Sequence, residues 1–206
     1  MEINFLTKSL PLALLFIRLL VASSADAGLA TRTSIGTTGS AEFIKASCSV
    51  TAYPKLCYAS LSTQATAIQG SPKLLAHAAL SLSLNTARST AADMAELLKW
   101  SSMRPKEVGA MRDCVEQLAD SVERLRRSAA EMNLISKRRS DFWLMMEDIQ
   151  TWVSAALTYE DTCMDGFAAR PTTCEVKIAV RGRISKMARM TSNALALINH
   201  YATIHG

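Results

Sequence analysis

Apolar residues recur at helical spacing in four long segments of the chain, residues 72–99, 106–132, 142–164 and 174–202. In the second segment, Val115, Leu118, Val122 and Leu125 fall on one stripe of a helix. Isolated helices of this kind cannot bury such stripes and must pack on one another. The connections between the segments are short, so the pattern predicts an all-α, up-down-up-down four-helix bundle.

Two shorter helical pieces precede the bundle, at residues 41–47 and 54–62, and the sequence Thr-Ala-Tyr-Pro separates them. Pro54 suits the first position of a helix, where its missing N–H costs nothing. We therefore expect an N-terminal helical hairpin. Residues 28–40 are rich in Gly, Ser and Thr and lack periodicity, which predicts a flexible lead-in. The domain is predicted to cover residues 41–206.

The first 27 residues differ from the rest of the chain. Lys8 precedes the apolar run "LPLALLFI", which is too short to cross a bilayer and is followed by Arg18. Ala25-Asp26-Ala27 has the small-x-small pattern of a cleavage site. These features predict a signal peptide at residues 1–27, cut after Ala27, and disfavour a membrane anchor. The mature protein is expected to be secreted, soluble and not associated with a membrane.

Secretion changes the interpretation of the five cysteines, because disulfides form and persist in an oxidising compartment. A bridge between Cys48 and Cys57 is sterically easy, since they flank the turn of the hairpin. Antiparallel packing also brings Cys114 level with Cys163, which makes a bridge between neighbouring helices natural. Five cysteines leave one unpaired, and spacing alone leaves several pairings open. The fifth cysteine is Cys174.

Composition and charge limit the possible partners. Only 6% of the residues are aromatic and glycine and proline are scarce, which favours a helical domain over a sheet protein. The formal net charge is +5. It could suit an anionic polysaccharide or an acidic partner, and ordinary solubility charge is an equally good interpretation. Nucleic acid is an improbable partner, because aromatic residues do not interleave with the basic ones.

The sequence shows no sign of an active site. It lacks GxSxG, HExxH and a glycine-rich phosphate loop, and its carboxylates do not cluster in a candidate cleft. His77 lies within a predicted helix, and His200 and His205 lie near the C-terminus, where a frayed, solvated tail is a better interpretation than a metal site. The pattern predicts a binding protein without cofactor or metal rather than an enzyme.

Acidic residues form an ordered pattern in the second long segment. Asp113, Glu116, Asp120 and Glu123 recur at helical spacing, on the side of the helix opposite its apolar stripe. The simplest interpretation is a solvated face. The alternative is a rigid acidic ridge that meets a partner.

Four stretches carry a resemblance to a known family: "SCSVTAYPKLCYASLS", "MRDCVEQLADSVERL", "MEDIQTWVSAALTYEDTCMDGF" and "MTSNALALIN". Together they resemble the plant invertase/pectin methylesterase inhibitor family over nearly all of residues 42–202. The resemblance implies a four-helix bundle with an N-terminal helical hairpin. It also implies disulfides Cys48–Cys57 and Cys114–Cys163, with Cys174 as a free thiol.

The resemblance implies one of two protein partners, pectin methylesterase or an invertase. Invertase inhibitors often carry Pro-Lys-Phe between the second and third long helices, and this chain lacks that motif there. "DIQTWVSAALTYEDTC" looks more like the pectin methylesterase side. We therefore expect a standalone, secreted inhibitor in the apoplast or cell wall that binds the esterase one to one and covers its pectin-binding cleft. The alternatives are an invertase inhibitor and a non-inhibitory bundle that binds pectin or a small ligand.

The resemblance also implies which surface meets the enzyme. In the family, the helix that follows the third cysteine faces the enzyme cleft, and here it offers Glu116, Gln117, Asp120 and Glu123. The segment just before the fourth cysteine also approaches the enzyme, and here it offers Asp161 and Thr162.

Overall fold

The computed structural model describes residues 39–99, 103–135, 141–168 and 174–205, and these parts of the chain contain helices and turns but no strand. Residues 39–48 are helical. The elements that follow are α2 (Pro54–Leu61), the 3-10 turn η1 (Ser62–Gln64), α3 (Ala65–Ile68), α4 (Pro72–Lys99), α5 (Pro105–Leu134), α6 (Phe142–Ala168) and α7 (Cys174–Thr203).

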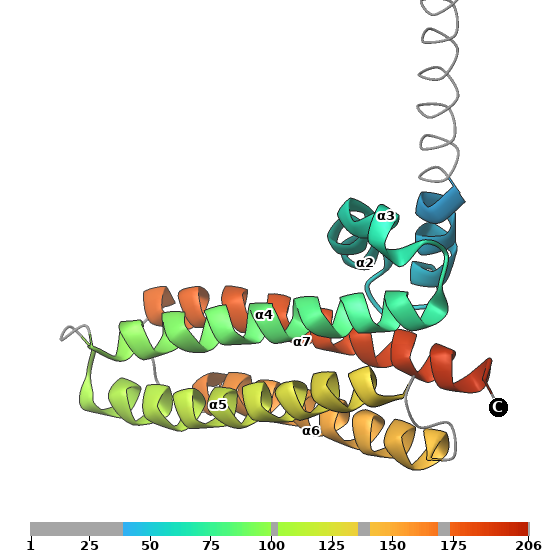
Figure 1. Ribbon diagram of the computed structural model, residues 1–206. Helices are drawn as coiled ribbons and strands as arrows, with labels where there is room; N and C mark the ends of the chain where they lie inside the picture. The colour runs from blue at the N-terminus through green and yellow to red at the C-terminus, as the bar shows by residue number, and fades with distance from the viewer. Residues whose placement is uncertain (1–38, 100–102, 136–140, 169–173, 206) are drawn as a thin grey trace, which may run out of the picture.

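The four long helices form the predicted bundle (Figure 1). The pairs that share extensive contacts are α4 with α5, α5 with α6, α6 with α7, and α7 with α4, so each helix packs against its neighbours in chain order and the ring closes. Figure 1 shows α4 beside α7 in one layer and α5 beside α6 in the other. The all-α, up-down-up-down architecture with an N-terminal hairpin and two disulfides is confirmed.

The buried positions along each long helix alternate between spacings of three and four residues, as helices packed side by side require. On α5 the buried line runs through Met111, Cys114, Leu118, Ser121, Leu125, Ser128 and Met132. Of the four residues in the predicted apolar stripe, Leu118 and Leu125 lie on this buried line, whereas Val115 and Val122 are only half-buried at its edge. Two serines hold interior positions that hydropathy alone assigns to the surface.

Polar residues occupy interior positions on all four helices of the bundle. Among the described residues they are Ser83 and Thr90 on α4, Glu107, Ser121 and Ser128 on α5, Glu160 on α6, and Thr191 and Asn193 on α7. The Ser128 hydroxyl donates to the Arg124 carbonyl within its own helix, at 2.9 Å. The bundle core is therefore a mixed one, in which apolar side chains enclose a few polar groups.

The helix ends largely match the sequence prediction. Ser71 caps α4, since its hydroxyl accepts from the Leu74 N–H at 3.3 Å. At the start of α5, the buried Glu107 carboxylate accepts from the Arg104 N–H at 2.8 Å and from its guanidinium at 3.1 Å. The predicted end of the third long helix at residue 164 was wrong, because α6 continues to Ala168. Phe167, which is buried at 3% exposure, anchors this extra turn and outweighs the low helix propensity of Gly166.

The hairpin has a small apolar core of its own against α4 and α7. Ile44, Leu61 and Ile68 contribute to this core from the hairpin side. The Asn193 side chain of α7 fixes the turn: its Oδ1 accepts from the Tyr53 N–H and its Nδ2 donates to the Tyr53 carbonyl, both at 3.0 Å. Residues 39 and 40 are helical, so the lead-in predicted for residues 28–40 extends too far. The predicted signal peptide at residues 1–27 lies outside the described residues.

Two disulfides cross-link the fold. Cys48 is bonded to Cys57 across the hairpin, and Cys114 of α5 is bonded to Cys163 of α6. Both pairings agree with those that the family resemblance implied. Within the described part of the chain, no helix combines the length and apolar character needed to cross a membrane.

Candidate functional site

The side chains predicted to meet a partner lie on α5 and α6, on either side of the Cys114–Cys163 disulfide. Glu116 and Gln117 follow Cys114 by two and three residues, and Asp161 and Thr162 directly precede Cys163. The disulfide joins the two helices at this level. The disulfide therefore holds the two predicted segments close to each other on neighbouring helices.

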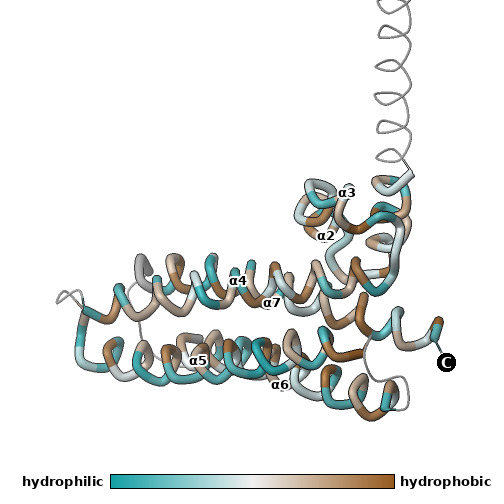
Figure 2. The backbone as a smooth tube through the Cα atoms, in the orientation of Figure 1, coloured by the Kyte–Doolittle hydropathy of each residue, from teal (hydrophilic) through white to brown (hydrophobic). Residues whose placement is uncertain are grey.

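The acidic stripe of α5 faces away from the core, as its position opposite the buried line predicts. Asp113, Glu116 and Asp120 are exposed, and Gln117 and Glu123 are partly exposed. Figure 2 shows that much of α5 is hydrophilic. Glu116 and Asp120 have no ion-pair partner among the described residues, so their charges are available to another molecule.

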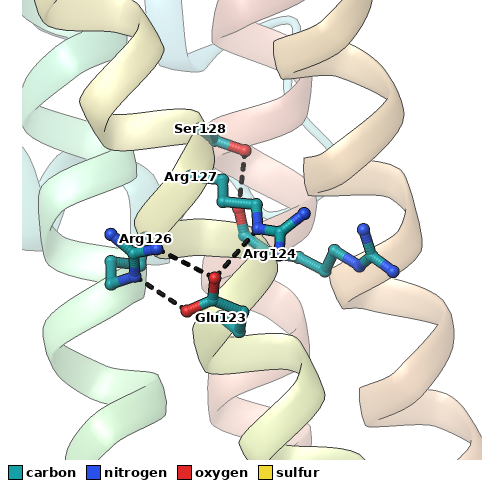
Figure 3. Close-up of polar contacts among 5 residues, drawn as sticks. All are labelled: Glu123, Arg124, Arg126, Arg127 and Ser128. Carbon is teal, nitrogen blue, oxygen red and sulfur yellow. Dashed lines mark hydrogen bonds and ion pairs between the residues drawn. The ribbon is translucent and has the colours of Figure 1, made fainter.

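Glu123 differs from the rest of the stripe, because arginines of its own helix neutralise it (Figure 3). Arg126 donates to both carboxylate oxygens at 2.7 and 2.9 Å, and Arg127 donates to one of them at 2.9 Å. The hydrogen bonds from Arg126 and Arg127 lower the pKa of Glu123 to about 2. The predicted acidic ridge is therefore shorter than its sequence spacing indicates, and it ends at Asp120.

The α6 part of the face is also acidic. Asp161 and Thr162 are exposed, and the Thr162 hydroxyl donates to the Thr158 carbonyl at 2.7 Å. Partial burial raises the pKa of Asp161, and the nearby charge of Asp165 raises it further. Asp165 is exposed one helical turn beyond Asp161. Asp165 also lines a pocket with Lys177 and Arg181 of α7, so it lies on the α6–α7 side of the bundle. We define the acidic face as Glu116 and Asp120 of α5 together with Asp161 of α6.

The carboxyl group of Glu160 lies inside the bundle next to this face and was missed by the sequence prediction. Its Oε1 accepts from the Ser121 hydroxyl at 2.8 Å and from the Thr191 hydroxyl at 3.0 Å, while Oε2 has no hydrogen-bond partner in the described residues. Burial raises the pKa of Glu160 to about 7. The burial of Glu160 could have been predicted from helical spacing. The buried residues Ile149, Val153, Ala156 and Cys163 alternate at intervals of three and four residues, and Glu160 falls at the missing position in this series.

The described residues contain no cluster of three or more metal-ligating side chains. His77 contacts Asn133 with its Nε2 2.9 Å from the amide oxygen. His205 is exposed, as the predicted solvated tail requires, but its ring contacts other rings: its ring centroid lies 4.4 Å from that of Tyr201 and 5.8 Å from that of Phe142. His200 is exposed in the last turn of α7. The side chain of Cys174, the predicted free thiol, lies outside the described residues.

Comparisons with known proteins agree on one family. A family model described as plant invertase/pectin methylesterase inhibitor matches residues 42–197. Pectinesterase inhibitor 11 from Arabidopsis thaliana is 43% identical over 193 residues, which cover 93% of this chain and 94% of the relative. A 21 kDa protein from Daucus carota is 44% identical over 165 residues, which cover 80% of this chain and 86% of the relative.

A solved structure shares the fold. The crystal structure of a mutant form of a pectin methylesterase inhibitor from Arabidopsis matches with a TM-score of 0.59 at 20% sequence identity. The match covers 74% of this chain and 92% of that chain.

Proposed function

Because the chain belongs to the plant invertase/pectin methylesterase inhibitor family, we propose that it inhibits pectin methylesterase. The observation that carries the proposal is the 43% identity to a relative named as a pectinesterase inhibitor, over 94% of the length of that relative. The family is one of inhibitors, so the chain itself is not an enzyme.

The inhibitor acts by binding, with no covalent step and no cofactor. One bundle binds one esterase molecule and covers the cleft that would otherwise hold pectin. Rigid packed helices suit this role, because a preformed surface loses little conformational entropy on docking. The acidic face on α5 and α6 is the surface that we assign to the enzyme. Its carboxylates would complement basic groups at the rim of the cleft and so favour association.

The protein acts outside the cell, in the apoplast or cell wall. This location fits the two disulfides, which are typical of proteins that fold in an oxidising compartment. It also fits the predicted signal peptide, whose removal after Ala27 would give a mature chain starting at Gly28.

Titrating the mature protein against a purified pectin methylesterase should abolish the esterase activity, with an endpoint at equal molar amounts. A parallel titration against an acid invertase, the other target class in the family name, should leave that activity unchanged. Loss of invertase activity alone would assign the chain to the other branch. Inhibition of neither enzyme would leave a non-inhibitory binding protein.

The double variant Glu116→Lys/Asp120→Lys should weaken esterase inhibition at least tenfold, which corresponds to about 1.4 kcal/mol of binding free energy. Both carboxylates are exposed and lack ion-pair partners among the described residues, so reversing their charge changes the surface and spares the core. Glu123 is left intact, because its replacement would also release Arg126 and Arg127. The measurements are inhibition constants and thermal melts followed by circular dichroism.

The control is Glu42→Lys/Glu96→Lys, which makes the same change of net charge at exposed carboxylates of the hairpin and α4. Glu96 pairs with Lys99 at 2.6 Å, but both side chains are exposed, so losing this pair should cost little stability. The control variant should change inhibition less than twofold. Equal losses in the two variants would show that net charge governs binding. Unchanged inhibition in the Glu116/Asp120 variant, with an intact fold, would assign the contact to a different face.

A further inference from the structure

A groove of about 850 Å³ lies where the hairpin meets α7. The turn and the first residues of α2, residues 52–56, form one wall, and three successive turns of α7, from Ile178 to Arg189, form the other. Its volume is within the range of sites that bind small molecules or short polymer segments. The proposed inhibitory mechanism does not use this groove.

The groove is strongly basic. Lys55, Arg181, Lys186 and Arg189 line it and are exposed, and no Asp or Glu of the described residues contributes to its lining. None of the four cations forms an ion pair with a described residue. Four unpaired cations around one hollow focus a positive potential, which attracts an anionic ligand.

The same groove also offers apolar surface. Ile178 is 66% exposed and Tyr53, on the hairpin wall, is 39% exposed. The guanidinium of Arg189 lies 5.3 Å from the centre of the Tyr53 ring. Gly182 lines the groove, and a Cβ at this position would meet no atom within 4 Å, so the space in front of it is open. A ligand that combines carboxylates with ring faces fits this lining better than a simple inorganic anion does.

The hairpin wall is held rigidly. Asn193 binds both backbone polar groups of Tyr53, and the Cys48–Cys57 disulfide closes the turn next to it. The groove is therefore formed before any ligand arrives, which lowers the entropic cost of binding. It is built by α7 and the hairpin, whereas the acidic face lies on α5 and α6. Figure 1 shows the hairpin above the α4–α7 layer, away from α5 and α6.

We infer that this basic groove binds a polyuronate, a polysaccharide whose sugar rings carry free carboxylates. The choice of a polysaccharide rests on the proposed function: hydrolysis of the methyl esters of pectin replaces uncharged esters with carboxylates. Arg181 and Arg189 would pair with these carboxylates through their planar guanidinium groups, and Tyr53 would contact a sugar ring. The inhibitor would then be retained on stretches of polymer that the esterase has already processed.

Binding of the mature protein should be measured against polygalacturonate and against a highly methyl-esterified pectin of the same length. We expect binding to the free-acid polymer, weakened by added salt, and at least tenfold weaker binding to the esterified one. The variant Arg181→Ser/Lys186→Ser/Arg189→Ser should lower affinity for polygalacturonate at least tenfold. The variant Gly182→Leu should also lower it, because it fills the groove without changing charge.

The matched control, Arg88→Ser/Lys106→Ser/Arg112→Ser, removes three exposed cations outside the groove and should bind polygalacturonate within twofold of the parent protein. Equal losses in both triple variants, or equal binding to the two polymers, would overturn the proposal. Calorimetry of inhibitor with esterase in the absence of polymer tests the proposed function separately. If the protein binds the esterase normally but does not bind polygalacturonate, the proposal for the groove is wrong and the proposed inhibition of the esterase stands. If a groove variant loses binding to the esterase but keeps its affinity for polygalacturonate, the groove is a contact surface for the enzyme, and the proposal is also overturned.

Discussion

Replacing Cys114 and Cys163 together by alanine should lower the free energy of unfolding by about 4 kcal/mol. The disulfide closes a loop with a sequence separation of 49, so its removal restores much conformational freedom to the unfolded chain. Both cysteines are also buried between α5 and α6, at 1% and 2% exposure, where the smaller alanines leave unfilled space. A loss of this size is a large part of the stability of a typical domain.

The hairpin disulfide provides the comparison. Its sequence separation is only 9, so Cys48→Ala/Cys57→Ala should cost about 2.5 kcal/mol. Urea unfolding of the parent and both double variants, without reductant, measures the two losses. Equal losses, or a larger loss at the hairpin, would contradict the loop-closure account. Both cysteines of a pair are replaced, because a single replacement would leave a thiol that could exchange with Cys174.

Non-reducing peptide mapping of the parent protein gives an independent check on the pairing. It should recover the Cys48–Cys57 and Cys114–Cys163 linkages and find Cys174 unpaired, as the family resemblance implies. A bridge between Cys174 and either cysteine of the second pair would contradict this assignment.

The four long helices could be predicted within a few residues, because each has an apolar face and a proline or capping residue near its start. Ser71 and Pro105 marked two starts correctly. The end of α6 could not be predicted in this way. Gly166 indicates a helix end, and only the packing of Phe167 in the folded core carries the helix past it.

The candidate site was predictable in part. The exposure of Glu116 and Asp120 follows from helical spacing alone, since they lie opposite the buried line of α5. The neutralisation of Glu123 depends on the rotamers of two arginines, which spacing permits but does not establish. The basic groove depends on how the hairpin docks on α7, because Lys55 and Arg189 are more than 130 residues apart in the chain. Neither feature can be derived from local sequence.

The buried Glu160 should make the protein less stable as the pH rises. In the unfolded chain its pKa is near the ordinary value of 4.5, and in the folded protein burial raises the pKa to about 7. At pH 4 the carboxyl is largely protonated in both states and costs little. Between these two pKa values the unfolded state releases its proton first, which favours unfolding. The stability contributed by the protonated carboxyl is therefore lost as the pH rises through 7, and the total loss is about 3 kcal/mol.

The groups around Glu160 explain why its ionised form is not stabilised. From α5 and α7 the side chains that reach its carboxyl are the Ser121 and Thr191 hydroxyls, and both bind the same oxygen. The charge that acts on it from its own helix is Asp161, which opposes ionisation further. No cation among the described residues forms an ion pair with Glu160.

The variant Glu160→Gln isolates this effect, because glutamine keeps the shape and the accepting oxygen of the protonated carboxyl but cannot ionise. Its free energy of unfolding, relative to the parent protein, should rise by about 3 kcal/mol between pH 4 and pH 8. Asp161→Asn changes the exposed neighbour instead, and at pH 4 it should differ from the parent by about 0.5 kcal/mol or less. Urea unfolding of the three proteins at both pH values gives the result. A difference between Glu160→Gln and the parent that stays constant with pH would show that the carboxylate is stabilised inside the bundle, and the account of an unpaired buried charge would then be wrong.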